Sequence, residues 1–533
     1  MGNEFNINVI FNQYKETLFE SKKYWMIYIV FIAAMFASTA LTNDFAHYKF
    51  NLLMFVFIAV LGIFCITYYF RHNSDDELYK VAFVIILCFG LISAIIVPIC
   101  DISDESEHLS RAEITSNGVI FPHWTGEDYN LTRLYNYTPD DVMRGYNKNA
   151  GYEMPNAMIF FIKNREITVL QTDKDTEKID FTPTIVNSAF EQNPFFGYIP
   201  QGIGIAIAKL LDLNLIWILW LARSFNLLCY AALISLAIKK TPCLKIPLLA
   251  VACIPITIYQ AASASIDSMI FGLGILAVAY FIYMLKSPVE NKDILIFALI
   301  SLLLGLCKLP YLAFIFLLLF VPFENYTDKV NSKRLILACI VIVAIIGLKW
   351  SDYATPTLMH SWRSHYFQFN ATAQTQYFLS EPARIGNFLF EIATKYPMIL
   401  VNQVFNFYGG NLSHAHYADN YYIITILLQL FLLFTLFIYP REVKFDIKTK
   451  LGVIAVILIV YIGTCWIQLL TWSPVGEIDL GISIRYFIPL LALIPIIGGT
   501  DRWTDNREID YYTVVLIIGF MATLVLAFTS KYY

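Results

Sequence analysis

Charged residues are scarce in this chain, because Asp, Glu, Lys and Arg make up only 15% of its 533 residues, whereas 58% are hydrophobic. The mean hydropathy is +0.60. So large an apolar fraction exceeds what a soluble core can bury, and it predicts a protein that uses lipid as its solvent. A basic excess is also missing, since 37 Lys and Arg face 41 Asp and Glu. Nucleic-acid binding requires cationic side chains that neutralise phosphates, so nucleic acid is excluded as a partner.

Cysteine motifs and the residue pattern of a cleaved signal peptide are missing as well. None of the nine cysteines forms a CxxC pair, and all nine lie in or at the ends of apolar runs. Such cysteines behave as small buried hydrophobes, so neither a zinc site nor a disulfide framework is expected. The first 25 residues lack the charged, apolar and small-residue order of a cleaved signal peptide. We therefore expect the transmembrane helices to direct insertion.

Long apolar runs are what the sequence contains in abundance. Twelve runs approach or exceed the ~20 residues that cross a bilayer core. The run from 293 to 323 is too long for one helix, and Pro310 disfavours helix for its predecessor, so we divide it at Lys308. About thirteen transmembrane helices in an all-α polytopic membrane protein follow. The twelve runs are 24 to 42, 50 to 70, 78 to 99, 215 to 238, 246 to 263, 266 to 285, 293 to 323, 335 to 350, 421 to 440, 451 to 472, 484 to 499 and 511 to 530.

Orientation follows from Lys and Arg in the short loops, which favour the cytoplasmic side. With a cytoplasmic N-terminus, seven basic short segments fall on one side, and two long polar segments fall outside. The chain is thus expected to divide into three transmembrane helices (1–100), an outer loop with an acidic motif (101–200), central helices (201–350), a second outer loop (351–420) and C-terminal helices (421–533).

The first outer loop is expected to hold a small mixed α/β subdomain. The runs AMIFFIKN and EITVLQT resemble strands, and turn residues surround them. The stretch from 197 to 211 is moderately apolar but short, and it contains Pro200 and Lys209. We interpret it as a helix at the outer interface that does not cross the membrane.

An acidic segment, CDISDESEHLSRAEITSNG, stands just outside the third helix. In a helix, Asp104, His108 and Arg111 share one face, because they are spaced at i, i+4 and i+7. The same segment also fits a plain helix start, where Asp104 is the cap and the dipole favours Glu105 in the first turn. Three other ionisable residues stand at the same predicted boundary, where charge is costly and usually functional, although Lys and Arg can also reach up to the interface. They are Asp267, Lys308 and Arg485.

Cations beside carboxylates suit transfer of a group from a lipid phosphate, because Lys and Arg hold the phosphate and a carboxylate takes the acceptor's proton. Arg223 and the segment HSWRSH, with His360, Arg363 and His365, add further groups or simply anchor helix ends. The segment NFYGGNLSHAHYADNYY has two His and a carboxylate, which either line a substrate site or bind a metal. These are His414, His416 and Asp419.

Six ordered blocks between about residue 97 and residue 500 resemble a bacterial family of polytopic membrane proteins of unknown function, DUF2142, which is distantly related to the GT-C glycosyltransferases. The blocks are DESEHLSRA, YIPQGIGIAIAKLLDL, LARSFNLL, IPITIYQAASASIDSMIFG, CKLPYL and RYFIPLLALIP. The resemblance implies a GT-C-like fold, a catalytic or metal-binding role for Asp104 and Glu105, and a lipid-phosphate role for Arg485. The chain departs from the family at Ser103 and Ile484, where proline and glycine are usual, and two extra helices precede the acidic loop.

We therefore expect a glycosyltransferase at the outer face of a bacterial plasma membrane. It would move a sugar from a polyprenyl-phosphate-linked donor to a cell-envelope glycan, a teichoic-acid-like polymer or a protein. The sequence leaves open whether a divalent cation, Mg or Mn, is a cofactor. Alternatives are a flippase for lipid-linked glycan, which should show internal repeats and midplane charges, a whole-glycan polymerase or ligase, and a scaffold. The expected site residues are Asp104, Glu105 and His108 for catalysis, Arg485, Lys308, Arg363 and Arg111 for the donor phosphate, and Asp267, Tyr198, Gln201, His365, His414 and His416 for lining the substrate.

Overall fold

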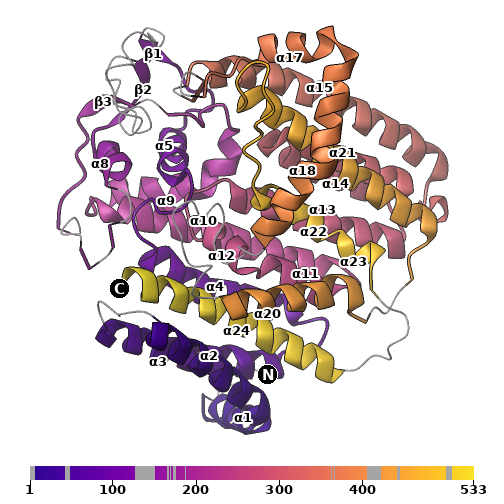
Figure 1. The fold of residues 1–533 in the computed structure, drawn as a ribbon. Helices are drawn as coiled ribbons and strands as arrows, with labels where there is room; N and C mark the ends of the chain where they lie inside the picture. Colours follow the sequence, from indigo (N-terminus) through magenta and orange to yellow (C-terminus); the bar gives the residue numbers. More distant parts are fainter. Residues whose placement is uncertain are drawn as a thin grey trace, which may run out of the picture.

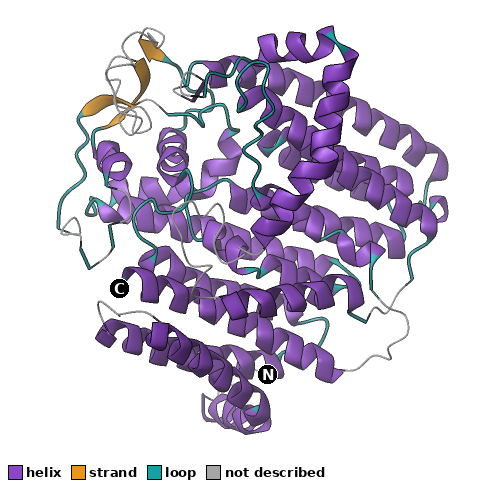
Figure 2. Ribbon diagram, viewed as in Figure 1, coloured by secondary structure: helices purple, strands orange, loops and turns teal. Residues whose placement is uncertain are grey.

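Helices account for most of the chain in the computed structural model, with one small sheet at a corner (Figure 2). The structure describes residues 7–42, 48–126, 150–164, 167–168, 170–171, 176–186, 188–361, 363–364, 367–404, 422–440, 444–499 and 507–533. Within these ranges, seven helices are long and apolar enough to cross a membrane, which confirms a polytopic helical architecture. The seven are α3 (Tyr48–Arg71), α4 (Leu78–Ile96), α10 (Ile216–Lys240), α13 (Asp267–Lys286), α15 (Lys329–Met359), α21 (Ile447–Thr471) and α24 (Arg507–Tyr532).

The predicted count of thirteen spans is not confirmed, because several apolar runs are broken by prolines. The run from 246 to 263 forms two short helices that part before Pro255, and the run from 484 to 499 forms three short pieces around Pro489 and Pro495. A proline lacks the amide hydrogen and clashes with the preceding turn, which breaks a continuous helix. The pieces are α11 (Lys245–Ala252), α12 (Pro255–Ala261), η5 (Ile484–Phe487), α22 (Ile488–Leu491) and α23 (Ile494–Ile497).

The remaining helices complete the bundle. The division predicted at Lys308 is present, since α14 ends at Cys307 and a 3-10 helix, η2, begins at Leu309. The other elements are α1 (Ile7–Glu20), α2 (Lys22–Thr42), α14 (Asn291–Cys307), η2 (Leu309–Phe320), η3 (Phe323–Asn325), α17 (Ala371–Ser380), α18 (Pro382–Val404), α20 (Tyr422–Leu433) and η4 (Phe434–Ile438).

The two ends of the sequence pack together. In Figure 1 the C-terminal helix α24 lies beside the N-terminal helices α2 and α3. The rings of Phe31 and Phe520 are 5.6 Å apart in an edge-on contact. Gly519 permits this approach, since a Cβ there would lie 2.9 Å from the Phe31 ring. Long-range packing of apolar faces, and not proximity along the chain, joins these helices.

The segment predicted as the first outer loop contains a small antiparallel sheet in the order β1 (Thr125–Gly126), β2 (Ala150–Pro155) and β3 (Pro183–Val186), beside α5 (Glu105–Ser116) and α8 (Ala157–Lys163). The expected mixed subdomain is therefore present. The strand prediction for AMIFFIKN is wrong, because this run forms α8, with Met158 and Phe161 buried on one helical face. A short apolar run does not separate strand from helix by periodicity. EITVLQT forms no strand at its described residues 167–168 and 170–171.

The helix predicted for 197 to 211 is confirmed as η1 (Phe195–Tyr198) followed by α9 (Ile199–Leu210). The α9 helix packs against both α5 and α10. Gly204 allows the close crossing, since a Cβ on it would lie 2.4 Å from the carbonyl oxygen of Leu221 in α10. The position of α9 at the membrane interface stays a prediction.

Among the described residues, contacts join several of the basic short segments at one end of the bundle. The ammonium of Lys245 donates to the carbonyl of Asp75, that of Lys286 to the carbonyl of Lys444, and Lys23 pairs with a carboxylate at the start of α24. Helix α4 begins at this end and leads at its other end into Asp104. The acidic loop and the basic segments therefore occupy opposite ends, and the cytoplasmic assignment of the basic end stays a prediction.

Candidate functional site

Asp104 lies immediately before α5 in a left-handed conformation, with φ of 63°. This conformation is uncommon outside glycine, although aspartate tolerates it better than most residues. The side chain makes no capping hydrogen bond to the helix. It points instead to two cations, with Oδ1 2.7 Å from Nη2 of Arg363 and Oδ2 3.1 Å from Nη2 of Arg485. The backbone strain thus presents a carboxylate to two guanidinium groups.

Arg485 lies between two carboxylates. It is the second residue of η5, and its side chain is only 5% exposed. Besides Asp104, it faces Asp267 at the start of α13, with Nη1 3.4 Å from Oδ2. Nε and Nη1 of Arg485 and Oδ2 of Asp267 form no aligned hydrogen bond in the described part of the chain. Buried polar atoms are normally satisfied, so the two Arg485 donors are available to hydrogen-bond ligand oxygens.

Lys308 supplies a third cation at the break between α14 and η2. Its backbone is extended, with φ of −153°, because Pro310 prevents α14 from continuing. The Lys308 ammonium lies 3.2 Å from the centre of the Tyr486 ring, a close cation–π contact. Tyr486 directly follows Arg485, so the two cations approach the same point from different helices.

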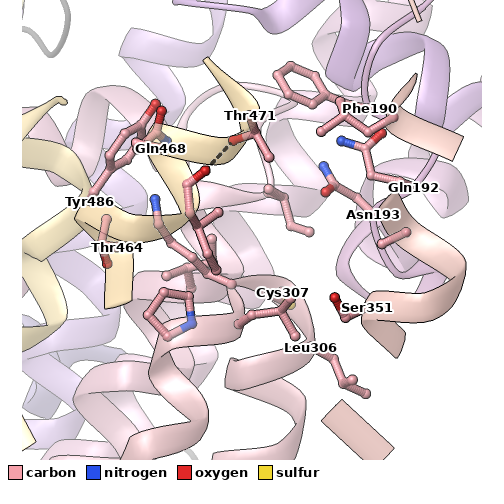
Figure 3. Close-up of a pocket in the computed structure, with 18 of the residues that line it drawn as sticks. Phe190, Gln192, Asn193, Leu306, Cys307, Ser351, Thr464, Gln468, Thr471 and Tyr486 are labelled. Atoms are coloured by element: carbon pink, nitrogen blue, oxygen red, sulfur yellow. Dashed lines mark hydrogen bonds between the residues drawn. The ribbon is translucent and has the colours of Figure 1, made fainter. Parts of the chain in front are cut away.

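One cavity of about 310 Å³ brings these groups together (Figure 3). Its charged and titratable lining consists of Asp104, His108, Asp267, Lys308, Arg363 and Arg485. In Figure 3, Gln192 and Asn193 reach in from one wall, and Gln468, Thr464 and Tyr486 stand on the opposite wall. Six predicted site residues from five separate segments therefore converge.

A second cavity of about 340 Å³ adjoins the first. Helix α18 contributes Lys395, Tyr396, Ile399 and Gln403 to it. The two cavities share five lining residues, so the ion-paired carboxylate is accessible from both. The shared residues are Asp104, Arg363, Trp472, Arg485 and Tyr486.

Electrostatics fix the protonation states in the outer loop. Burial would raise the pKa of Asp104, but the charges of Arg363 and Arg485 outweigh it and hold this pKa well below its usual value. Asp104 is therefore ionised at neutral pH. Burial lowers the pKa of His108 to about 4, so its imidazole is neutral. His108 stacks on Phe190 with ring centres 4.4 Å apart, and its Nδ1 lies 2.6 Å from the Tyr198 hydroxyl.

Glu105, predicted as a catalytic candidate, is directed away from both cavities. Its oxygens receive Nε and Nη2 of Arg223 at 2.8 and 2.6 Å, and both side chains have no exposed surface. Glu105 also accepts the backbone N–H of Ala264, 3.0 Å away. Arg223 further donates to three carbonyl oxygens at the end of α4. This arrangement joins α4, α5, α10 and the loop before α13 and positions Asp104.

Three other predicted residues surround the cavities without lining them. Arg111 donates to the carbonyls of Asn193 and Ile120, so its guanidinium holds the outer loop and does not face the Asp104 cluster. The Tyr198 hydroxyl receives the Asn193 amide. Gln201 donates to the carbonyls of Ala264 and Ser265 at 3.3 and 3.4 Å. All three support the walls.

A metal site is not formed by the residues that the structure describes. No three His, Cys, Asp or Glu side chains among them are placed to hold one ion. The Asp104 and Asp267 oxygens face arginines, so the cluster does not fit Mg or Mn. His360 stacks near Trp124, outside the cavity lining. His365, His414, His416 and Asp419 lie outside the described residues.

Several cavity residues have no local signature in the sequence. Gln192 and Asn193 follow the sheet in a polar loop, and Gln468 lies within an apolar helix. Tyr486 could have been found, because it adjoins Arg485 in the RYF block. Neutral polar side chains carry no charge that would mark them against an ordinary loop or helix.

The apolar helical bundle, with an ion-paired cavity at one end, defines a polytopic membrane protein. The chain belongs to the DUF2142 family of predicted membrane proteins, whose family model matches residues 87–494. This match confirms the family resemblance. No curated protein and no solved structure matches the chain.

Proposed function

We propose that this protein is a GT-C-type glycosyltransferase, which takes a sugar from a polyprenyl-phosphate donor and passes it to a cell-envelope acceptor. The observation that carries the proposal is the Asp104 carboxylate, held by two arginines where two cavities meet. A donor in one cavity and an acceptor in the other would stand on either side of this carboxylate. The proposed location is the outer face of a bacterial plasma membrane.

The charge of the first cavity suits one phosphodiester. Among the described residues that line it, three cations (Lys308, Arg363 and Arg485) face two carboxylates (Asp104 and Asp267). With His108 neutral and Lys308 protonated, one positive charge remains, which equals the single negative charge of a lipid-linked sugar phosphate. Guanidinium groups also match phosphate oxygens in geometry.

The lining of the same cavity supports a lipid carrier over a water-soluble one. Apolar side chains from four segments stand beside the charged cluster: Leu306, Pro310, Leu358, Ile467 and Leu470. An isoprenoid chain next to its phosphate would contact such a surface favourably, because apolar groups avoid water. The neighbouring helices α15 and α21 carry many exposed apolar residues, which is typical of a surface facing acyl chains.

The proposed step is a single displacement. The acceptor hydroxyl oxygen bonds to the anomeric carbon, its proton passes to Asp104, and the anomeric carbon–oxygen bond to phosphate breaks with its electron pair on the phosphate. Arg485 and Lys308 stabilise the charge that develops on the leaving group. Attack from the face opposite the phosphate inverts the anomeric centre.

Asp104 is a weak base while both arginines hold it, because nearby positive charge favours its ionised form. A donor phosphate would compete for the same guanidinium groups. Loosening the two ion pairs would raise the basicity of Asp104 only when the donor is bound. This coupling makes proton abstraction dependent on substrate.

The placement of the charges supports an enzyme over a flippase. The cluster lies at the end of the bundle opposite the basic segments, whereas a transporter needs charged groups near the bilayer midplane. A whole-glycan ligase would use the same two cavities, and the size of the transferred group in a transfer assay distinguishes it.

The test is transfer of radiolabelled sugar from synthetic polyprenyl-phosphate sugars by the purified protein in lipid. Asp104→Asn should reduce transfer by about 10²–10⁴-fold, the usual contribution of a general base. Glu508→Gln, which removes an exposed ion pair with Lys23 at the opposite end of the bundle, is the matched control and should retain activity. An EDTA arm tests whether His414, His416 and Asp419 contribute a metal.

Full activity in Asp104→Asn would reject this mechanism. Failure of the wild-type protein to transfer from any donor to any acceptor would reject the proposed function. A thermal unfolding curve for each variant separates lost chemistry from lost folding.

A further inference from the structure

We propose that the first cavity selects an uncharged sugar, and that Gln192, Gln468 and Thr464 hydrogen-bond its hydroxyl groups. This inference rests on the proposed function, since it assumes that the cavity holds a lipid-linked sugar. It adds the substrate class and the residues that recognise it.

Gln192 and Gln468 are polar residues of the cavity wall whose side chains do not hold the fold together by hydrogen bonds to other described residues. Within the described part of the chain, neither side chain donates or accepts a hydrogen bond, and both line the cavity. Gln403 shows the contrast, because its amide donates to the carbonyl of Ile482 at 2.9 Å and accepts the N–H of Ile484 at 2.7 Å. Gln403 therefore serves the fold, whereas the two cavity amides are available to a ligand.

Thr464 gives an independent indication of a ligand. Thr464 lines the cavity, the residue is 1% exposed, and its Oγ1 has no hydrogen-bond partner in the described chain. The neighbouring Thr471 differs, since its hydroxyl donates to the carbonyl of Ile467 at 2.7 Å. An unsatisfied buried hydroxyl is costly, so a bound group should satisfy it.

The three side chains stand on facing walls. Thr464 and Gln468 are one helical turn apart on α21, which places them on the same face. Figure 3 shows them opposite Gln192, with the cavity between. A sugar ring in this space would meet hydrogen-bonding groups on two sides.

The charge balance excludes an acidic sugar. Arg363 and Arg485 already face carboxylates, and one phosphate uses the remaining positive charge of the cavity. A second negative charge on the sugar would have no net positive charge left in the cavity to balance it, which is strongly unfavourable. Amides and hydroxyls both donate and accept, so they match neutral sugar hydroxyls instead.

The test measures binding of three probes to the protein in lipid nanodiscs: polyprenyl phosphate, its glucosyl ester and its glucuronosyl ester. Each displaces radiolabelled polyprenyl phosphate. We expect the glucosyl probe to bind at least about tenfold more tightly than the glucuronosyl probe. Gln192→Ala and Gln468→Ala should each weaken glucosyl binding about fivefold, the value of one uncharged hydrogen bond, and leave polyprenyl phosphate unchanged.

Two controls complete the design. Gln13→Ala removes an exposed glutamine that contacts Arg71 at the opposite end of the bundle, and it should change nothing. Gln192→Lys adds the missing cation and should narrow or reverse the preference for the glucosyl probe.

Equal affinities for both sugars, or alanine variants that weaken unglycosylated polyprenyl phosphate to the same degree, would overturn the inference while leaving the lipid-phosphate site intact. No binding of polyprenyl phosphate at all would reject the proposed function, and the inference with it.

Discussion

The buried pair of Glu105 and Arg223 allows a structural role to be separated from a catalytic one. Glu105→Gln keeps the side-chain shape but leaves an uncompensated guanidinium with no exposed surface. Removing one partner of a buried ion pair costs ~3–5 kcal/mol. We expect the lower end, ~3 kcal/mol, because Arg223 keeps its three carbonyl acceptors and glutamine still offers an oxygen. An unfolding entropy of ~2.1 cal/mol/K per residue converts this into a Tm lower by about 3 °C for 533 residues.

Thermal unfolding in lipid nanodiscs measures this loss through a thiol-reactive dye. All nine cysteines are buried or half-buried, so labelling reports unfolding. The control, Glu508→Gln, breaks an exposed pair with Lys23 at 3.7 Å and should leave the Tm almost unchanged, because exposed ion pairs contribute little to stability. A Glu105→Gln protein with unchanged Tm and no transfer activity would refute the structural assignment and would indicate a catalytic role for Glu105.

Three further predictions concern the cluster, the outer loop and the helix packing. Arg485→Gln should weaken polyprenyl-phosphate binding at least about tenfold in the displacement assay, and Arg485→Lys should recover only part of it, because an ammonium lacks the guanidinium fork; equal binding by all three proteins would contradict this. Burial raises the pKa of Glu191 from 4.5 to about 7, so the folded state keeps a proton that the unfolded state loses, and this contribution to stability falls as pH rises between these values. Glu191→Gln has no carboxyl group to titrate, so the Tm of this variant relative to that of the wild type should rise from pH 5 to pH 8. A Tm difference that stays constant with pH would refute the argument. Gly204→Ala should destabilise by ~1–3 kcal/mol, because its Cβ would meet the α10 backbone at 2.4 Å; Gly386→Ala, with nothing within 4 Å, is the control and should unfold no earlier than the wild type.

Local sequence features were sufficient to predict the class of protein and the neighbourhood of the site. Apolar runs predict membrane helices because only lipid can solvate them, and the unusual charges at Asp104, Asp267, Lys308 and Arg485 stood out against that background. The structure brings these four residues into one cavity. The break between α14 and η2 at Lys308 was also predictable from local chemistry, since proline restricts the backbone of the residues just before it.

Only the tertiary structure separated Asp104 from Glu105. The two acids are adjacent and chemically alike, so no local pattern distinguishes them. Glu105 meets Arg223, a residue 118 positions away, whereas the left-handed backbone of Asp104 directs its carboxylate to Arg363 and Arg485. The partner of a charged side chain depends on long-range packing, and such contacts leave no trace in local spacing.

The same reason applies to the neutral residues of the cavity. Gln192, Thr464 and Gln468 carry no charge that makes burial costly enough to mark them, and they meet only when α21 packs opposite the outer loop. The apolar runs thus predicted a lipid environment, and the unusual charges within them predicted the region of the site. Which acid faces the cavity, and which uncharged groups surround it, was decided by contacts between segments that are far apart in the sequence.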